Sequence, residues 1–225
     1  MPIGSHPGNT VRPTRRTSGS SSLPGYDKDS GKTDKNAPAS QILASSWPGH
    51  SDFAARNPLE IGLLQYLLKK FGRVSWERIL SGPGIKNIYD FLRDTGKEEE
   101  PSWLAEQMRD VHDPPALISQ LALNKKAAIC EAALSIFVSV YGAATGNCAL
   151  NFMSTGGIFI GGSIAAKILP KMQDPIFMQS LLDKGRMRSL LEDMPVKIVL
   201  NDDSGLIGAA RYALVQKAFG KVSRI

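Results

Sequence analysis

Two side chains of the 225-residue chain, a carboxylate and an imidazole, could bind a ligand or transfer a proton. Glu77 lies in VSWERILSGPGIKNIYDFL, residues 74–92, and His50 lies in PGHSDFAARN, two residues before Asp52. A carboxylate in the first turn of a helix also interacts favourably with the helix dipole, and a single histidine near a carboxylate also serves as a hydrogen-bonding group in a loop. Residue type alone therefore leaves a structural and a functional interpretation open for both.

Gly161 and Gly162 follow a short apolar run and precede a helical pattern in STGGIFIGGSIA, residues 154–165. Where the Cβ atom is missing, a backbone can approach a nucleotide closely. The spacing matches neither the GxxxxGK[ST] phosphate loop nor G-x-G-x-x-G. The two glycines are therefore either nucleotide-approach residues or glycines required for packing.

The remaining reactive side chains predict neither a metal site nor a catalytic nucleophile. The histidines His6, His50 and His112 are far apart in the sequence. Cys130 and Cys148 lie in apolar surroundings, which favours reduced, buried thiols over a disulfide framework. No catalytic residue and no metal ligand is predicted from these residues.

The net charge of +6 raises nucleic acid as a partner class. The charge is spread evenly, because residues 1–57 hold 7 basic and 4 acidic residues while residues 58–225 hold 20 and 17. Nucleic-acid binding usually needs a clustered basic face with aromatic residues that stack on bases, and the sequence has neither. The longest apolar run, residues 127–144, contains Glu131 and is shorter than the roughly 20 residues of a membrane span. It predicts a buried core helix, and neither nucleic acid nor a membrane is expected as a partner.

Residues 1–40 are rich in Ser, Gly, Pro, Thr and Lys and show no hydrophobic periodicity, which predicts a disordered leader. The first 26 residues carry three arginines and no acidic residue, as organelle transit peptides do. The favoured interpretation is an unstructured leader without a targeting role, so a cytoplasmic location is expected, with an organelle as the alternative. Order is expected to begin near Gln41, so residues 41–225 form the structured domain.

Capping signals place the Glu77 stretch between helices. Asn57-Pro58 starts a helix that ends at Phe71-Gly72, and Ser75 starts a second, short helix. Residues 81–84, Ser-Gly-Pro-Gly, stop that short helix, and Pro83 can start the next one. Because Pro locks φ and Gly permits positive φ, this turn should fix the angle between the two helices.

Helix dominates the rest of the chain. A helix opens after Asp113-Pro114-Pro115, a long one covers about residues 126–142, and more helix follows over 143–153. Short strands are predicted at 157–160 and 196–201, and a last helix at 206–219. The mixture of strand and helix predicts an α/β fold.

Read together and in order, these stretches resemble the bacterial-type glucokinases of the hexokinase–actin superfamily. The resemblance covers about residues 41–220 and rests on four blocks: GHSDFAARN (49–57), RVSWERILSGPGIKNIYDFLR (73–93), GNCALNFMSTGGIFIGGSIAAKILP (146–170) and DKGRM…MPVKIVLNDDSGLIGAA (183–210). It implies a ribonuclease-H-like, actin/hexokinase-type kinase lobe, helix-rich with a small mixed sheet. Only the larger, carboxy-terminal lobe is matched, so the fold is expected to be incomplete, with the amino-terminal lobe missing.

The resemblance also assigns roles to the site residues. In the family, a Glu-Gly-Gly-His segment and the glutamate of a Ser-x-Glu-Arg block hold hydroxyls of glucose, and His50 and Glu77 match these positions. Gly161 and Gly162 match the glycine pair on the adenosine side of the nucleotide. Trp47 and Pro48 stand where the family has the first glutamate and the next glycine, so one sugar-binding carboxylate is expected to be lost.

The resemblance implies ATP-dependent phosphorylation of glucose to glucose 6-phosphate, with ATP and Mg²⁺ as cofactors. The phosphate loops and the catalytic base belong to the lobe that is expected to be missing, so activity of this chain alone is expected to be impaired. The alternative is a non-catalytic sugar-binding or interaction module, or a truncated gene product. Exposure of a surface that the other lobe would cover predicts a homodimer or a complementary lobe as partner, besides glucose and ATP.

Overall fold

The computed structural model describes residues 48–218, which lie within one compact unit of the chain, residues 47–225. The predicted leader, the hypothesis of a transit peptide in residues 1–26, the expected onset of order near Gln41 and the departure from the family at Trp47 all fall outside the described residues.

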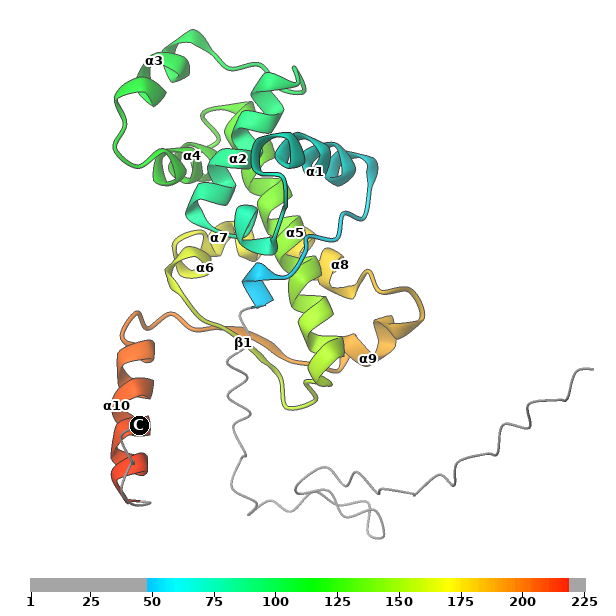
Figure 1. The fold of residues 1–225 in the computed structure, drawn as a ribbon, viewed down its shortest axis with the longest axis vertical. Coiled ribbons are helices and arrows are strands. Elements are labelled where there is room, and N and C mark those ends of the chain that lie inside the picture. The colour runs from blue at the N-terminus through cyan, green and yellow to red at the C-terminus, as the bar shows by residue number, and fades with distance from the viewer. Residues whose placement is uncertain (1–47, 219–225) are drawn as a thin grey trace, which may run out of the picture. The chain divides into compact units, whose positions relative to one another are not determined.

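Helices make up most of the described fold, which is shown in Figure 1. The α-helices are α1 (Pro58–Phe71), α2 (Gly82–Asp94), α3 (Ser102–Asp110), α4 (Pro114–Leu123), α5 (Ala128–Phe152), α6 (Ser163–Lys167), α7 (Leu169–Met172), α8 (Pro175–Leu182), α9 (Arg188–Glu192) and α10 (Ser204–Ala218). Three short 3₁₀ helices are η1 (Pro48–His50), η2 (Trp76–Arg78) and η3 (Gly185–Met187), and the strands are β1 (Ile158–Ile160) and β2 (Val196–Ile198).

The long helix α5 forms the centre of the core, and α2, α4 and α8 pack against it (Figure 1). Gly142 and Gly146 lie one turn apart on α5 and face α8. A Cβ atom at these positions would lie 2.2 Å from the carbonyl oxygen of Phe177 and 2.4 Å from that of Leu181. The two glycines therefore permit a close approach of the α5 and α8 backbones.

This packing explains a difference from the sequence-based expectation. Two helical segments meeting near Gly142 were expected, but α5 continues through that glycine without a break. By length and composition α5 is the one helix among the described residues that could cross a membrane, and core helices pass the same test. Because 56% of its most apolar window is buried inside the fold, the prediction of a buried core helix is confirmed.

The two strands form a small parallel sheet, with Ile158 opposite Val196 and Ile160 opposite Ile198. Parallel strands need a long crossover, and the segment containing α6 to α9 supplies it. A helix-rich fold with a small sheet is therefore confirmed. The sheet in the described residues is parallel rather than mixed, because it contains only this one pair of strands.

Local capping signals predicted the start of α1 correctly, and α2 begins at Gly82, one residue before the predicted Pro83, with Ser81 as its N-cap. The Asn57 side chain accepts a hydrogen bond from the backbone N–H of Glu60 at 2.9 Å, and the Ser81 hydroxyl accepts one from Gly84 at 3.0 Å. Gly72, with φ of +71°, follows the last residue of α1.

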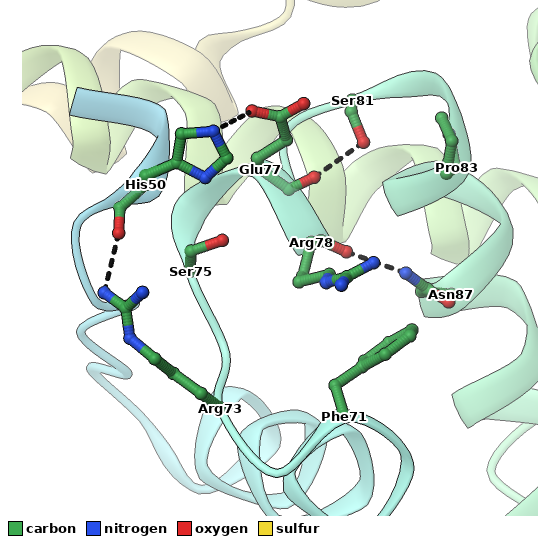
Figure 2. Close-up of a pocket in the computed structure, with 9 residues that line it drawn as sticks. All are labelled: His50, Phe71, Arg73, Ser75, Glu77, Arg78, Ser81, Pro83 and Asn87. Carbon is green, nitrogen blue, oxygen red and sulfur yellow. Dashed lines mark hydrogen bonds and ion pairs between the residues drawn. The ribbon is translucent and has the colours of Figure 1, made fainter. Parts of the chain in front are cut away.

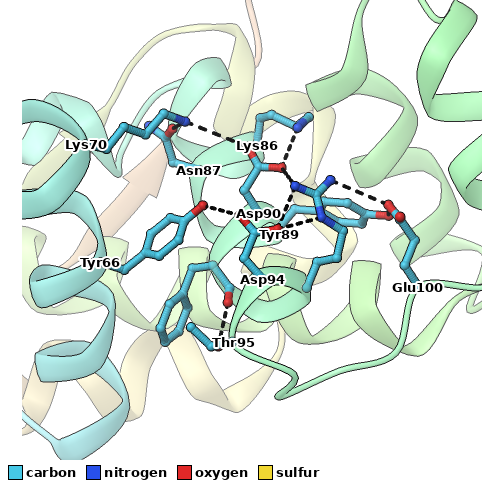
Figure 3. A network of polar contacts seen from close by, with 11 residues as sticks. Tyr66, Lys70, Lys86, Asn87, Tyr89, Asp90, Asp94, Thr95 and Glu100 are labelled. Atoms are coloured by element: carbon cyan, nitrogen blue, oxygen red, sulfur yellow. Dashed lines mark hydrogen bonds and ion pairs between the residues drawn. The ribbon is translucent and has the colours of Figure 1, made fainter.

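A polar network on α2, shown in Figure 3, joins this helix to its neighbours. Lys86 and Arg93 both pair with the largely buried carboxylate of Asp90. The Tyr89 hydroxyl donates to Glu100 at 2.5 Å. Glu100 lies in the acidic loop after α2 and is only 16% exposed, so this loop is less solvated than its run of three glutamates indicates.

Exposed apolar side chains gather on β1 and α10. Phe159 is 65% exposed, and Leu206 and Leu214 are 73% and 71% exposed. The expectation of a homodimer or a complementary lobe stays a prediction, since these side chains alone do not identify an occupant.

Candidate functional site

His50 and Glu77 are separated by 26 intervening residues but lie side by side in the structure, and Figure 2 shows their side chains facing each other. Nε2 of His50 lies 3.7 Å from Oε2 of Glu77, and the two side chains are 64% and 48% exposed. An isolated bridge between Asp52 and Ser75 holds the two segments together in antiparallel fashion. The structure thus joins the two residues that the resemblance assigns to sugar binding.

Arg73 ties the His50 segment to the Glu77 segment. Its Nη2 donates to the carbonyl oxygen of His50 at 2.7 Å, and its Nε donates to Oδ1 of Asp52 at 2.8 Å. Two further backbone hydrogen bonds, from Trp76 to Ser51 and from Phe53 to Val74, each at 3.0 Å, extend the contact. The backbone segment that carries the His50 imidazole is therefore held both by the Arg73 side chain and by backbone hydrogen bonds.

The Ser-Gly-Pro-Gly turn holds Glu77 from the other direction. The Ser81 hydroxyl donates to the carbonyl oxygen of Glu77 at 2.6 Å and accepts from the backbone N–H of Gly84 at 3.0 Å. A Cβ atom at Gly84 would lie 2.0 Å from the carbonyl oxygen of Ile79. The turn therefore packs directly on the end of the segment that carries Glu77. The expected use of positive φ is not found, because Gly82 and Gly84 both lie in the first turn of α2 and the lack of a Cβ atom at Gly84 is what the packing requires.

A polar cavity of about 480 Å³ opens beside His50 and Glu77 (Figure 2). It is lined by His50, Phe71, Arg73, Ser75, Glu77, Arg78, Ser81, Pro83 and Asn87. We call it the arginine cavity.

A second cavity, of about 700 Å³, shares Glu77 and Ser81 with the first and is more apolar. Its lining includes Gly49, Trp76, Tyr141, Thr145, Asn147, Cys148, Asn151, Ile160 and Gly161. We call it the strand cavity, because β1 lines it. Glu77 therefore lines both cavities. Gly161 lines the strand cavity, His50 lines the arginine cavity, and Gly162 lines neither.

The surroundings of the two glycines argue against the packing interpretation, and the assignment to a nucleotide stays a prediction. A Cβ atom at Gly161 or Gly162 would meet no other atom within 4 Å, so neither glycine is required for packing. Gly162 has φ of +101°, a conformation that L side chains rarely adopt, and it precedes α6. Gly161 needs no such conformation and borders open space, which leaves room for close approach of a ligand.

Sequence reasoning missed three residues of the arginine cavity: Arg73, Ser75 and Arg78. Arg73, Ser75 and Glu77 alternate with the buried Val74 and the half-buried Trp76. This alternation of period two was the signal that could have identified a row of polar side chains on one side of the segment.

The cysteines are both free, as predicted, but they differ in environment. Cys130 is fully buried, and burial raises the pKa of its thiol to about 12. Cys148 is half-buried and lines the strand cavity, which its apolar sequence context did not indicate. Among residues 48–218, no group of three or more His, Cys, Asp or Glu side chains could hold a metal ion.

Comparison with known proteins gives one consistent result. Residues 36–216 match the sequence profile of the glucokinase family. The glucokinases of Nostoc punctiforme and Synechocystis sp. are 45% and 44% identical to this chain over 177 and 173 residues. These alignments cover 73% and 72% of this chain and 52% and 49% of the relatives, so the chain spans about half the length of the curated relatives it matches.

Two solved structures resemble the fold. A glucokinase from an Antarctic psychrotroph is 32% identical with a TM-score of 0.62, and the match covers 73% of this chain and 48% of that chain. A glucokinase from Balamuthia mandrillaris, solved in complex with glucose, is 17% identical with a TM-score of 0.57, over 67% of this chain and 41% of that one. The second likeness concerns the fold alone.

Proposed function

Because the chain belongs to the glucokinase family, we propose that its described residues bind glucose as part of an ATP-dependent phosphorylation of the sugar. The chain spans about half the length of its curated relatives, so the activity of a whole glucokinase is itself part of this proposal.

The pairing of His50 with Glu77 carries the proposal. A sugar presents neighbouring hydroxyl groups, and a carboxylate accepts hydrogen bonds from hydroxyls more strongly than a neutral group does. The separation of 3.7 Å between Nε2 and Oε2 is longer than a normal hydrogen bond, so the two side chains are not locked to each other. Both remain exposed enough to exchange water for sugar hydroxyls at the rim of the arginine cavity.

The strand cavity supports the nucleotide part of the proposal. Glu77 lines it together with Gly161, so a ligand in this cavity would lie between the sugar-binding carboxylate and an open glycine backbone. Its apolar lining suits a heteroaromatic base. We assign Gly161 to close contact with ATP and Gly162 to the backbone conformation that turns β1 into α6.

The described residues do not provide a metal site, so Mg²⁺ would enter with the phosphates of ATP. When bound, Mg²⁺ neutralises charge on the phosphates. The residues of this chain would bind and orient the sugar.

We further propose that these residues alone transfer phosphate slowly or not at all. Within the described part of the chain, Glu77 is the one carboxylate that lines the arginine cavity. The same group would have to hold a sugar hydroxyl and also accept the proton of the attacking hydroxyl. These two tasks usually fall to different groups, and a dedicated general base contributes roughly 10²- to 10⁴-fold to the rate. A homodimer or a complementary chain could supply the second group.

Isothermal titration of the full chain with glucose tests the proposal, with Glu77→Gln as the variant. Glu106→Gln is the matched control, because Glu106 is an exposed glutamate on α3, remote in sequence from both cavities. We expect glucose to bind the wild type and the control with equal affinity, and Glu77→Gln to bind at least about tenfold more weakly. Equal binding by all three proteins would refute the assignment of Glu77.

A coupled assay for glucose 6-phosphate separates the two candidate functions. Binding without turnover supports a non-catalytic sugar-binding module, which the single carboxylate of the arginine cavity favours. Turnover at a rate typical of kinases, on the order of 1–100 s⁻¹, would overturn the proposal of slow transfer and would leave that of glucose binding intact.

A further inference from the structure

Two polar groups in the arginine cavity have no hydrogen-bonding or ionic partner among the described residues: the Ser75 hydroxyl and the Arg78 guanidinium. Ser75 as a residue is only 8% exposed. Figure 2 shows its oxygen directed into the cavity. Its hydroxyl is therefore held at the cavity wall and is available to a ligand atom that enters the cavity.

The Arg78 guanidinium is held in place by stacking rather than by an ion pair. Its Cζ lies 4.1 Å from the centroid of the Phe71 ring. The backbone carbonyl oxygen of Arg78 accepts a hydrogen bond from the Asn87 side chain at 2.9 Å, which holds the backbone that carries the guanidinium. All donors of this guanidinium therefore remain available within a fixed plane.

Arg73 has spare donors on the same cavity. Its Nε and Nη2 atoms are engaged with Asp52 and with the carbonyl oxygen of His50. The hydrogens on Nη1 are not used by these bonds. Figure 2 shows Arg73, Ser75 and Arg78 around one opening, at successive places along the continuous segment 73–78.

The charges around the opening favour an anion. Arg73 and Arg78 both line it, whereas Lys70, next to Phe71 in the sequence, donates to the Asn87 side chain at 3.1 Å and pairs with Asp90 at 3.8 Å. Among the described residues Glu77 is the one acid of the lining, and Asp52, outside the lining, pairs with Arg73 at 2.7 Å. The His50 imidazole faces Glu77.

We propose that the arginine cavity binds a phosphate-class oxyanion through Arg73, Ser75 and Arg78. A tetrahedral oxyanion presents oxygens in several directions and so can meet three donors that approach from different sides. A planar carboxylate presents two oxygens and would meet only part of this set. The oxyanion is inorganic phosphate or the phosphate group of a phosphorylated sugar, and these two sources share the same chemistry.

The proposed anion site is independent of sugar binding by Glu77. The two proposals predict opposite effects of one substitution. Glu77→Gln should weaken glucose binding at least about tenfold. It should preserve or strengthen phosphate binding, since it removes the one carboxylate of the described lining. Loss of phosphate binding in Glu77→Gln would overturn the separate anion site. Unchanged glucose binding in the same variant would refute the sugar site alone.

The experiment is titration of the full chain with inorganic phosphate at constant ionic strength. Arg78→Gln should bind phosphate at least about tenfold more weakly, because a charge-assisted hydrogen bond is lost, and Ser75→Ala should also weaken binding. The matched control is Arg109→Gln, since Arg109 is an exposed arginine on α3. Its affinity for phosphate should equal that of the wild type.

A second titration, with glucose 6-phosphate, identifies the source of the oxyanion. Tighter binding than that of inorganic phosphate assigns the site to a phosphorylated sugar, and equal binding assigns it to the free anion. The proposal is overturned if inorganic phosphate shows no saturable binding to the wild type, or if Arg78→Gln and Arg109→Gln change the affinity equally. Circular dichroism of each variant shows whether the fold is retained.

Discussion

The hydroxyl of Ser81 donates a hydrogen bond to the carbonyl oxygen of Glu77 at 2.6 Å while it accepts one from the backbone N–H of Gly84 at 3.0 Å. One side chain thus joins the segment that carries the proposed sugar-binding carboxylate to the first turn of α2. Helix capping and the position of Glu77 are therefore coupled, and a change at Ser81 should affect both stability and ligand binding.

Ser81→Ala tests this coupling. The loss of a serine N-cap should lower the free energy of unfolding by about 1 kcal/mol and weaken glucose binding, because the Glu77 segment loses a restraint. Urea denaturation and glucose titration measure the two effects. Ser119→Ala is the control, since the Ser119 hydroxyl only bonds to the carbonyl oxygen of Pro115 within α4. A Ser81→Ala protein with the stability of the wild type would contradict the capping role.

The two glycines of the turn should respond differently to alanine. A Cβ atom at Gly84 would lie 2.0 Å from the carbonyl oxygen of Ile79, whereas one at Gly82 would lie 3.9 Å from its nearest neighbour, Pro115. Gly84→Ala should therefore destabilise the protein by about 1–3 kcal/mol through overpacking, and Gly82→Ala should be nearly neutral. Thermal or urea unfolding of both variants checks this. Equal effects at both positions would show that the turn is less tightly packed than the structure indicates.

Gly161→Ala separates nucleotide binding from folding. Because the added methyl group would meet no protein atom within 4 Å, the free energy of unfolding should stay unchanged. The affinity for ATP should fall if the backbone approaches the nucleotide as proposed. Gly156→Ala, equally unobstructed and outside the lining of the strand cavity, should change neither quantity. Unaltered ATP affinity in Gly161→Ala would remove Gly161 from the nucleotide site.

The pairing of Tyr66 with Asp94 predicts a specific dependence of stability on pH. The Tyr66 hydroxyl donates to Oδ2 of Asp94 at 2.6 Å, and this bond, together with the charge of Arg93, holds the pKa of Asp94 below its ordinary value. A carboxyl with a lowered pKa in the folded state stabilises that state while it is ionised. The contribution is complete above the ordinary carboxyl pKa of about 4 and is lost as the pH falls through the lower folded value.

Tyr66→Phe should therefore unfold at a lower urea concentration than the wild type at neutral pH, and the difference should shrink below about pH 4. Tyr141→Phe is the control, because the Tyr141 ring packs between Phe137 and Phe177 and has no carboxylate partner in the described structure. Its effect on stability should not depend on pH in the acidic range. A Tyr66→Phe difference that is constant with pH would contradict the assigned pKa shift.

Local signals predicted the elements around the site well. The N-caps at Asn57 and Ser81 are set by residues within four positions of each helix start, so the sequence alone contains the information. The role of Gly142 was harder to predict, because an isolated glycine in a helical pattern can either end the helix or permit close packing. The carbonyl oxygen of Phe177, 35 positions further along the chain, decides between these roles.

The site itself was predictable only in part. His50 and Glu77 were identified through the four matching blocks, but their contact depends on the bridge between Asp52 and Ser75, which joins residues far apart in sequence. Ser75 was interpreted as a helix cap, yet its side chain makes no capping hydrogen bond and instead faces the arginine cavity. Non-local pairing of this kind leaves little trace in the sequence of either segment.

A crystal structure of the full chain grown with glucose tests the central claim most directly. We expect ordered sugar density at the rim of the arginine cavity, with hydroxyl oxygens within hydrogen-bonding distance, about 2.6–3.2 Å, of the Glu77 carboxylate and the His50 imidazole. Sugar bound at another place on the protein, with His50 and Glu77 contacting only each other, would contradict it.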